Sequence, residues 1–86
     1  MRKVEFLYNP NAGNLKIRGL LDKIIEKFQL AGFRVSIYRS MGKGDMGAYI
    51  ERNITNDNTD ILLISGGDGS VNEVVNAMMK KDLKVP

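Results

Sequence analysis

The sequence predicts a small α/β domain in which a parallel sheet and its helices form three layers in the order βαβαβα. Three short apolar stretches of strand character alternate strictly with three helical patterns. Strands that alternate with helices form parallel βαβ units with right-handed crossovers. A chain of 86 residues is long enough for one domain of this kind.

The first strand and helix are predicted over Val4–Tyr8 and from Asn14 onward. The strand ends at Asn9-Pro10, because proline has no N–H for the sheet and favours an extended residue before it. Gly32 ends the helix, since glycine readily takes a left-handed conformation. Between these limits, apolar residues recur at the helical period of 3.6, at Ile17, Leu20, Leu21, Ile24, Ile25, Phe28 and Ala31.

The second strand is predicted over Phe33–Arg39. Apolar Phe33, Val35 and Ile37 alternate there with Arg34, Ser36 and Tyr38, which indicates one buried face and a place at the edge of the sheet. A weaker helical stripe follows, formed by Met46, Tyr49, Ile50 and Ile54.

The third strand, Ile61–Ile64, is apolar at every position, as expected of a parallel strand covered on both faces. A third helix follows, ends near Asp82, and has its stripe at Val71, Val74, Val75, Met78 and Met79. An edge-like second strand and a buried third strand favour the strand order two-one-three. The loops 9–13, 40–44 and 66–70 then share the carboxyl edge of the sheet, where open α/β sheets bind ligands.

Composition excludes several kinds of chemistry. The chain contains no cysteine and no histidine, which removes disulfides, thiol nucleophiles, histidine bases and zinc sites built on these residues. The longest apolar run is only Ile61–Ile64, and no signal-peptide core follows the first residues, so we expect a cytoplasmic chain. The net charge of +3 is explained best by a lysine-rich solvated surface, and no nucleic-acid recognition motif accompanies it.

The most informative segment is Gly66-Gly67-Asp68-Gly69-Ser70, between the third strand and the third helix. Glycines let a phosphate approach the N–H groups at the helix start, where the dipole favours an anion. Asp68 would repel phosphate unless a divalent cation or a substrate hydroxyl proton lies between them, which points to Mg²⁺ and a nucleoside triphosphate. Two plainer explanations stay open: a tight turn with a solvent-facing aspartate, and an S-x-x-E capping box formed by Ser70 and Glu73.

The first loop, Asn9-Pro10-Asn11-Ala12-Gly13, also lies between a strand and a helix. Its two asparagines suit a phosphate or a ribose, although a plain connecting turn explains the loop equally well. The chain lacks G-x-x-x-x-G-K-[ST], so it has no P-loop, and it lacks G-x-G-x-x-G after its first strand, the fingerprint of dinucleotide binding.

Taken together, these segments resemble the nucleotide-binding half of the diacylglycerol kinase catalytic domain, a superfamily that includes bacterial diacylglycerol kinases, YegS-like lipid kinases, and sphingosine and ceramide kinases. The resemblance rests on Asn9–Gly13, on Ser40 with Gly44-Asp45, and on the run from Gly66 to Asn76. Gly-Gly-Asp-Gly alone also occurs in 6-phosphofructokinases and NAD kinases, but the Asn-Glu-Val-Val-Asn continuation and the Asn-Pro loop are more particular to lipid kinases. Ser70 replaces the usual threonine, and Met46 replaces the usual alanine.

The resemblance implies a Rossmann-like, NAD kinase- and diacylglycerol kinase-like N-terminal subdomain spanning residues 1–86. It implies a kinase that uses ATP and Mg²⁺ in phospholipid metabolism, transferring the γ-phosphoryl group to a lipid hydroxyl such as that of diacylglycerol. Asp68 would hold the metal. The residues that would hold the nucleotide are Asn9, Pro10, Asn11, Ala12, Gly13, Ser40, Gly66, Gly67, Asp68, Gly69, Ser70, Val71, Asn72 and Glu73.

In this family the catalytic base and the lipid site belong to a further, β-rich domain, so we expect the 86 residues alone to be inactive. The expected partners are ATP, a lipid acceptor, the anionic inner face of a membrane for the longer protein, and a second copy of the chain; nucleic acid is not expected. Two alternatives stay open: part of a sugar-phosphate or NAD kinase, or a non-catalytic α/β module that binds an anion.

Overall fold

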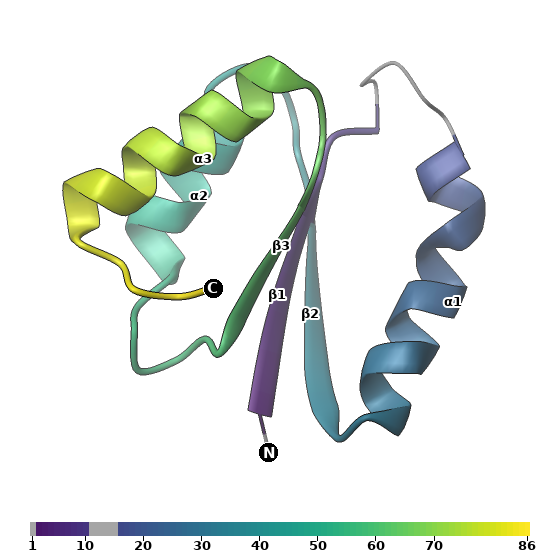
Figure 1. Ribbon diagram of the computed structural model, residues 1–86. Helices are drawn as coiled ribbons and strands as arrows, with labels where there is room; N and C mark the ends of the chain where they lie inside the picture. Colours follow the sequence, from purple (N-terminus) through teal and green to yellow (C-terminus); the bar gives the residue numbers. More distant parts are fainter. Residues whose placement is uncertain (1, 11–15) are drawn as a thin grey trace.

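The computed structural model describes residues 2–10 and 16–86, and its elements follow one another as the sequence predicts (Figure 1). Strands and helices alternate without exception in the described chain. The elements are β1 (Arg2–Tyr8), α1 (Lys16–Leu30), β2 (Phe33–Arg39), α2 (Asp45–Asn53), β3 (Ile61–Ser65) and α3 (Asp68–Lys81).

The three strands form one parallel sheet in the order β2-β1-β3, so the predicted strand order is confirmed. Val4 of β1 lies opposite Val35 of β2 and Ile61 of β3. Figure 1 shows α1 on one face of the sheet and α2 with α3 on the other. The predicted three-layer arrangement is therefore confirmed.

The best-buried part of the core lies between β1 and the α2–α3 layer. Val4 to Tyr8 of β1 are all buried. A cluster of buried side chains joins this strand to the two helices, and its members are Leu7, Met46, Ile50, Ile54, Val74 and Ala77.

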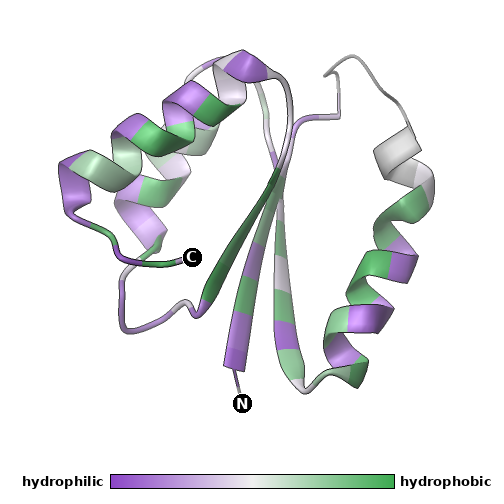
Figure 2. Ribbon diagram, in the orientation of Figure 1, coloured by the Kyte–Doolittle hydropathy of each residue, from purple (hydrophilic) through white to green (hydrophobic). Residues whose placement is uncertain are grey.

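Strand β3 differs from its prediction. Figure 2 shows it as apolar over most of its length, yet all five of its residues are only half-buried. In the described chain β3 is the second edge of the sheet, beside which only the last residues run: the N–H of Leu62 donates to the carbonyl of Pro86 at 2.9 Å. The apolar run identified a strand correctly but did not reveal its place in the sheet.

Strand β2 uses both of its faces, although the sequence predicts one buried face. Phe33 packs edge-on against Phe28 of α1, with ring centroids 5.6 Å apart. On the other face, Tyr38 stacks on Tyr49 of α2 at 4.0 Å, while Ile37, expected inside, is 40% exposed. The predicted edge position is confirmed, and an aromatic side chain on the nominally polar face makes that face part of the core.

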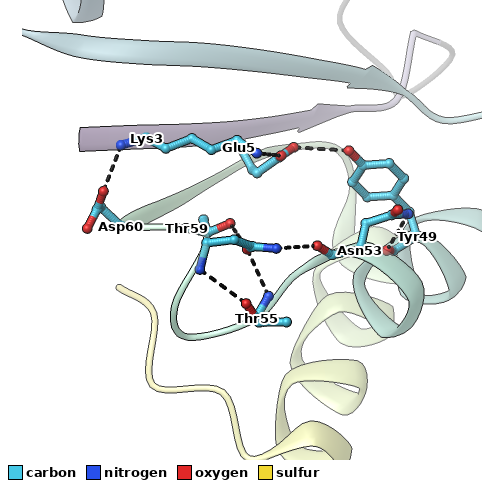
Figure 3. A network of polar contacts seen from close by, with 8 residues as sticks. Lys3, Glu5, Tyr49, Asn53, Thr55, Thr59 and Asp60 are labelled. Atoms are coloured by element: carbon cyan, nitrogen blue, oxygen red, sulfur yellow. Dashed lines mark hydrogen bonds and ion pairs between the residues drawn. The ribbon is translucent and has the colours of Figure 1, made fainter. Parts of the chain in front are cut away.

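A polar network crosses the core beside this stack (Figure 3). The buried carboxylate of Glu5 pairs with the Lys3 ammonium at 3.0 Å and accepts the Tyr49 hydroxyl at 3.1 Å. Burial, together with the nearby Glu5 carboxylate, raises the pKa of Tyr49 to about 12. Tyr49 therefore stays protonated and keeps β1 joined to α2.

Across the described residues, we find no helix with the length and apolar character that crossing a membrane requires.

Candidate functional site

The loops that follow the three strands meet at the carboxyl edge of the sheet. The N–H of Asn9, after β1, donates to the Ser65 carbonyl at the end of β3 at 2.8 Å. The N–H of Ser40, after β2, donates to the Tyr8 carbonyl at 2.8 Å. These two bonds continue the sheet by one residue and bring the loops of all three strands side by side.

The loops enclose an open cleft of about 710 Å³. Four of its lining residues are glycines, so much of its wall is bare backbone, and one lining residue carries a positive charge. The residues that line it are Asn9, Gly42, Lys43, Gly44, Gly67, Gly69, Ser70 and Glu73.

One wall of the cleft is the glycine-rich turn that begins α3. The helix starts at Asp68, with Gly67 as its N-cap and no side chain capping it; its first ladder bond runs from the Val71 N–H to the Gly67 carbonyl at 3.1 Å. The N–H groups of the first turn have no partner within the helix. They therefore present donors, at the positive end of the helix dipole, to an anion in the cleft.

Gly66 is required by the packing of this turn. A Cβ at position 66 would lie 2.7 Å from the Cβ of Ser70 and 2.8 Å from its Oγ. The close approach lets β3 pass directly into α3, which aims the first turn of the helix at the cleft.

The opposite wall is the loop between β2 and α2. The Ser40 hydroxyl donates to the Gly42 carbonyl at 3.1 Å, and Gly44 takes a left-handed conformation with φ of 85°. Asp45 accepts bonds from the Tyr38 hydroxyl at 2.6 Å and the Met41 N–H at 2.7 Å. These two bonds, led by that from Tyr38, lower the pKa of Asp45, so the carboxylate that folds the loop is ionised at neutral pH.

Glu73 joins the two walls. Its Oε1 accepts the Gly47 N–H at 2.8 Å, and its Oε2 accepts the Gly44 N–H at 3.1 Å. The capping-box interpretation of Ser70 and Glu73 is therefore wrong: α3 starts two residues before Ser70, and Glu73 binds the first turn of α2 instead. A short motif signals a capping acid, but not which helix that acid caps.

The structure brings together some of the predicted nucleotide-binding residues. Asn9, Gly67, Gly69, Ser70 and Glu73 line the cleft. Asn11, Ala12 and Gly13 lie outside the described residues. The remaining predicted residues lie beside the cleft without lining it, and they are Pro10, Ser40, Gly66, Asp68, Val71 and Asn72.

Two of these flanking residues have a clear structural role. Ser40 is buried and its hydroxyl is used within its own loop, so it shapes the wall from behind. Pro10 is fully buried and ends β1.

The sequence analysis missed Lys43. It is exposed and lines the cleft between Gly42 and Gly44. A signal was available, because a cation flanked by glycines follows a strand at the ligand-binding edge.

The residues offer only limited means to hold a metal ion. In residues 2–10 and 16–86, no three acidic, histidine or cysteine side chains gather in one place. Asp68, in the exposed first turn of α3, is a single carboxylate. Mg²⁺ often binds through one or two carboxylates together with substrate phosphates, so Asp68 fits an ion that arrives with a polyphosphate.

A three-layer α/β domain with an open, glycine-walled cleft at its carboxyl edge belongs to a broad class of ligand-binding α/β folds. Comparison of the sequence with known protein families narrows this class. The family model of the diacylglycerol kinase catalytic domain matches residues 3–86. The chain belongs to this family, as its motifs led us to expect. Membership in the sugar-phosphate or NAD kinase families is thereby set aside.

Known diacylglycerol kinases match nearly the whole chain. That of Staphylococcus saprophyticus is 32% identical over 80 residues, covering 93% of this chain and 26% of the relative. That of Staphylococcus haemolyticus is 35% identical over 82 residues, covering 94% and 24%. A crystal structure of a diacylglycerol kinase from Bacillus anthracis superposes with a TM-score of 0.77 at 27% identity, covering 98% of this chain and 30% of that one. The chain thus spans about a quarter of the length of these curated relatives.

Proposed function

We propose that residues 1–86 are the N-terminal, nucleotide-binding subdomain of an ATP-dependent lipid kinase. The reaction is transfer of the γ-phosphoryl group of ATP to a lipid hydroxyl such as that of diacylglycerol. The observation that carries the proposal is the cleft of about 710 Å³ between the start of α3 and the loop before α2. Membership in the diacylglycerol kinase family supports the reaction class.

Each wall of the cleft has a distinct role in this proposal. The N–H groups of Gly69 and Ser70, at the start of α3, donate to phosphate oxygens. Lys43 contributes a positive charge from the opposite wall, and Asn9 offers an amide for the ribose or base. The chain's own residues position the triphosphate, and positioning is the larger part of catalysis in phosphoryl transfer.

Asp68 is the proposed contact for Mg²⁺. When bound with the nucleotide, the ion neutralises charge on the phosphate oxygens. The Asp68 carboxylate at the helix start would otherwise repel those oxygens, so the proposal makes its effect on binding depend on the metal.

The catalytic base and the lipid site are proposed to lie in a part of the longer protein that these residues do not include. The 86-residue chain alone should then bind nucleotide weakly and fail to phosphorylate diacylglycerol in micelles. For the longer protein we propose a cytoplasmic location, peripheral attachment to the anionic inner face of the membrane, and self-association.

Saturation-transfer NMR with the 86-residue chain tests the nucleotide proposal. Mg-ATP is expected to receive saturation on its adenine protons, with a Kd of about 1 mM, which corresponds to about −4 kcal/mol. Magnesium tripolyphosphate competes for the same cleft, and adenosine alone does not bind. Binding of magnesium tripolyphosphate, seen as shifts of the chain's amide signals, without any saturation of the adenine protons of Mg-ATP would favour the anion-binding module over the kinase.

A further inference from the structure

Glu73 makes the contacts that connect the two sides of the cleft, and its geometry assigns each carboxylate oxygen a separate donor. Oε1 lies 2.8 Å from the Gly47 nitrogen and Oε2 lies 3.1 Å from the Gly44 nitrogen. Glu73 comes from the second turn of α3, and its two donors belong to the start of α2. Glu73 therefore joins α3 to α2 through donors that lie 26 and 29 positions before it in the sequence.

The two donors are those that a helix most needs to have capped. Gly44 is the N-cap of α2 and, as a glycine, has no side chain with which to cap the helix. Gly47 is the third residue of the helix. In a capping box, the N-cap and third-residue N–H groups are bound by two side chains of the same helix. Here one carboxylate from α3 serves both positions.

Close packing fixes this arrangement. Gly47 is buried, and a Cβ at this position would lie 3.1 Å from the Cγ of Glu73. The start of α2 thus lies directly on the side chain that caps it. Because Gly44 ends the loop that carries Lys43, the cap also fixes where that loop stands over the glycine-rich turn.

We propose that Glu73 is a positioning residue of the nucleotide site: it holds the loop 42–44 so that Lys43 and the start of α3 bind one polyphosphate between them. The inference rests on the proposed function for its ligand, but the clamp itself is a property of the free chain. It differs from the family-based expectation, in which Glu73 itself holds the nucleotide.

Three possible roles for Glu73 predict different effects of its substitution on polyphosphate binding and on amide protection. If Glu73 mattered only through its charge, removing that charge beside the cleft would strengthen polyphosphate binding. If it contacted the nucleotide directly, binding would weaken while the loop stayed as it is. If it is a clamp, binding weakens and the Gly44 and Gly47 amides lose their protection.

Glu73→Gln and Glu73→Asp separate these roles. Glutamine keeps the shape but has one acceptor oxygen, so one of the two N–H groups faces an NH₂ group. Aspartate keeps the charge and both oxygens but is one methylene shorter, so it does not reach. Glu26→Gln, on the exposed side of α1, is the matched control.

The experiment measures amide hydrogen exchange without ligand and Mg-ATP affinity by NMR titration, after circular dichroism has established folding. Both Glu73 variants should exchange the Gly44 and Gly47 amides at least about fivefold faster and bind Mg-ATP about fivefold more weakly, as expected for one lost hydrogen bond. Lys43→Ala should weaken binding in the wild-type background and have little further effect in Glu73→Gln.

Several results would overturn the clamp. Tighter Mg-ATP binding by Glu73→Gln shows a charge effect, and weaker binding with unchanged exchange shows a direct ligand. If Glu73→Asp binds Mg-ATP with wild-type affinity, the length of the side chain at position 73 does not matter for binding. If the wild-type chain does not bind Mg-ATP, the proposed function fails, and the exchange rates of ligand-free Gly44 and Gly47 still decide whether Glu73 holds the loop.

Discussion

Replacing Gly66 by alanine tests the packing that aims α3 at the cleft. The new Cβ would lie 2.7 Å from the Cβ of Ser70, whereas carbon atoms pack at about 3.5–4.0 Å. The overlap of about 1 Å cannot be removed by rotating a side chain, because the Cβ of Ser70 is fixed to the helix backbone. Either β3 or the first turn of α3 must shift.

Such overpacking costs about 1–3 kcal/mol of folding free energy. In a domain of this size, 1 kcal/mol corresponds to about 4–8 °C in Tm. We therefore expect Gly66→Ala to lower the Tm by about 5–20 °C, measured by circular dichroism at several scan rates. Gly67→Ala is the control: its Cβ would meet no atom within 4 Å, so its effect should stay within about 0.5 kcal/mol.

A second substitution makes the test specific. Ser70→Gly removes the two atoms that the new Cβ would approach within 3 Å, and by itself costs about 0.5–1 kcal/mol of helix stability. The double variant Gly66→Ala with Ser70→Gly should nevertheless melt above Gly66→Ala alone. A wild-type Tm in Gly66→Ala, or strictly additive losses in the double variant, would refute the reasoning.

Three further predictions concern the metal contact, a helix end and pH. Asp68→Ala should abolish the gain in ATP affinity that Mg²⁺ provides, and an unchanged magnesium dependence in NMR titrations would remove Asp68 as the metal contact. Lys81 donates to the carbonyls of Ile50 at 3.1 Å and Glu51 at 3.0 Å and also to that of Ile54, so Lys81→Met should cost about 1–3 kcal/mol in urea unfolding. Lys80→Met, which loses only an exposed ion pair, should cost no more than about 0.5 kcal/mol. Because the pKa of Tyr49 is raised from 10.0 to about 12, its contribution to stability is complete below pH 10 and is lost as the pH rises towards 12, where the unfolded chain ionises first; Tyr49→Phe should flatten this alkaline loss.

Local patterns sufficed for most of the fold. The strand Phe33–Arg39 was predicted with its observed limits, and Gly32 and Pro10 lie at the predicted ends of α1 and β1. The beginning of α3 was placed too late, because the stripe of apolar residues starts at Val71 while the helix starts at Asp68. Glycines in a first helical turn carry no periodic signal, although their N–H groups build the proposed site.

The site itself depended on contacts that sequence spacing does not encode. The glycine-rich turn identified one wall, and the favoured strand order placed residues 40–44 at the same edge of the sheet. The hydrogen bonds that join the two walls could not be predicted from spacing. Glu73 was assigned to the cap of its own helix because motif reasoning considers neighbours three positions apart. Its actual donors lie in another βαβ unit, which only the packing of α2 on α3 could reveal.

The most direct measurement of the central claim is a protein-observed NMR titration of the ¹⁵N-labelled chain with Mg-ATP. We predict that the amide signals of Lys43, Gly44, Gly67, Gly69 and Ser70 shift together along one saturable curve, while those of the exposed side of α1 stay in place. The account would be contradicted if the signals at the start of α3 did not move at Mg-ATP concentrations up to about ten times a millimolar Kd. Shifts confined to another surface would contradict it as well.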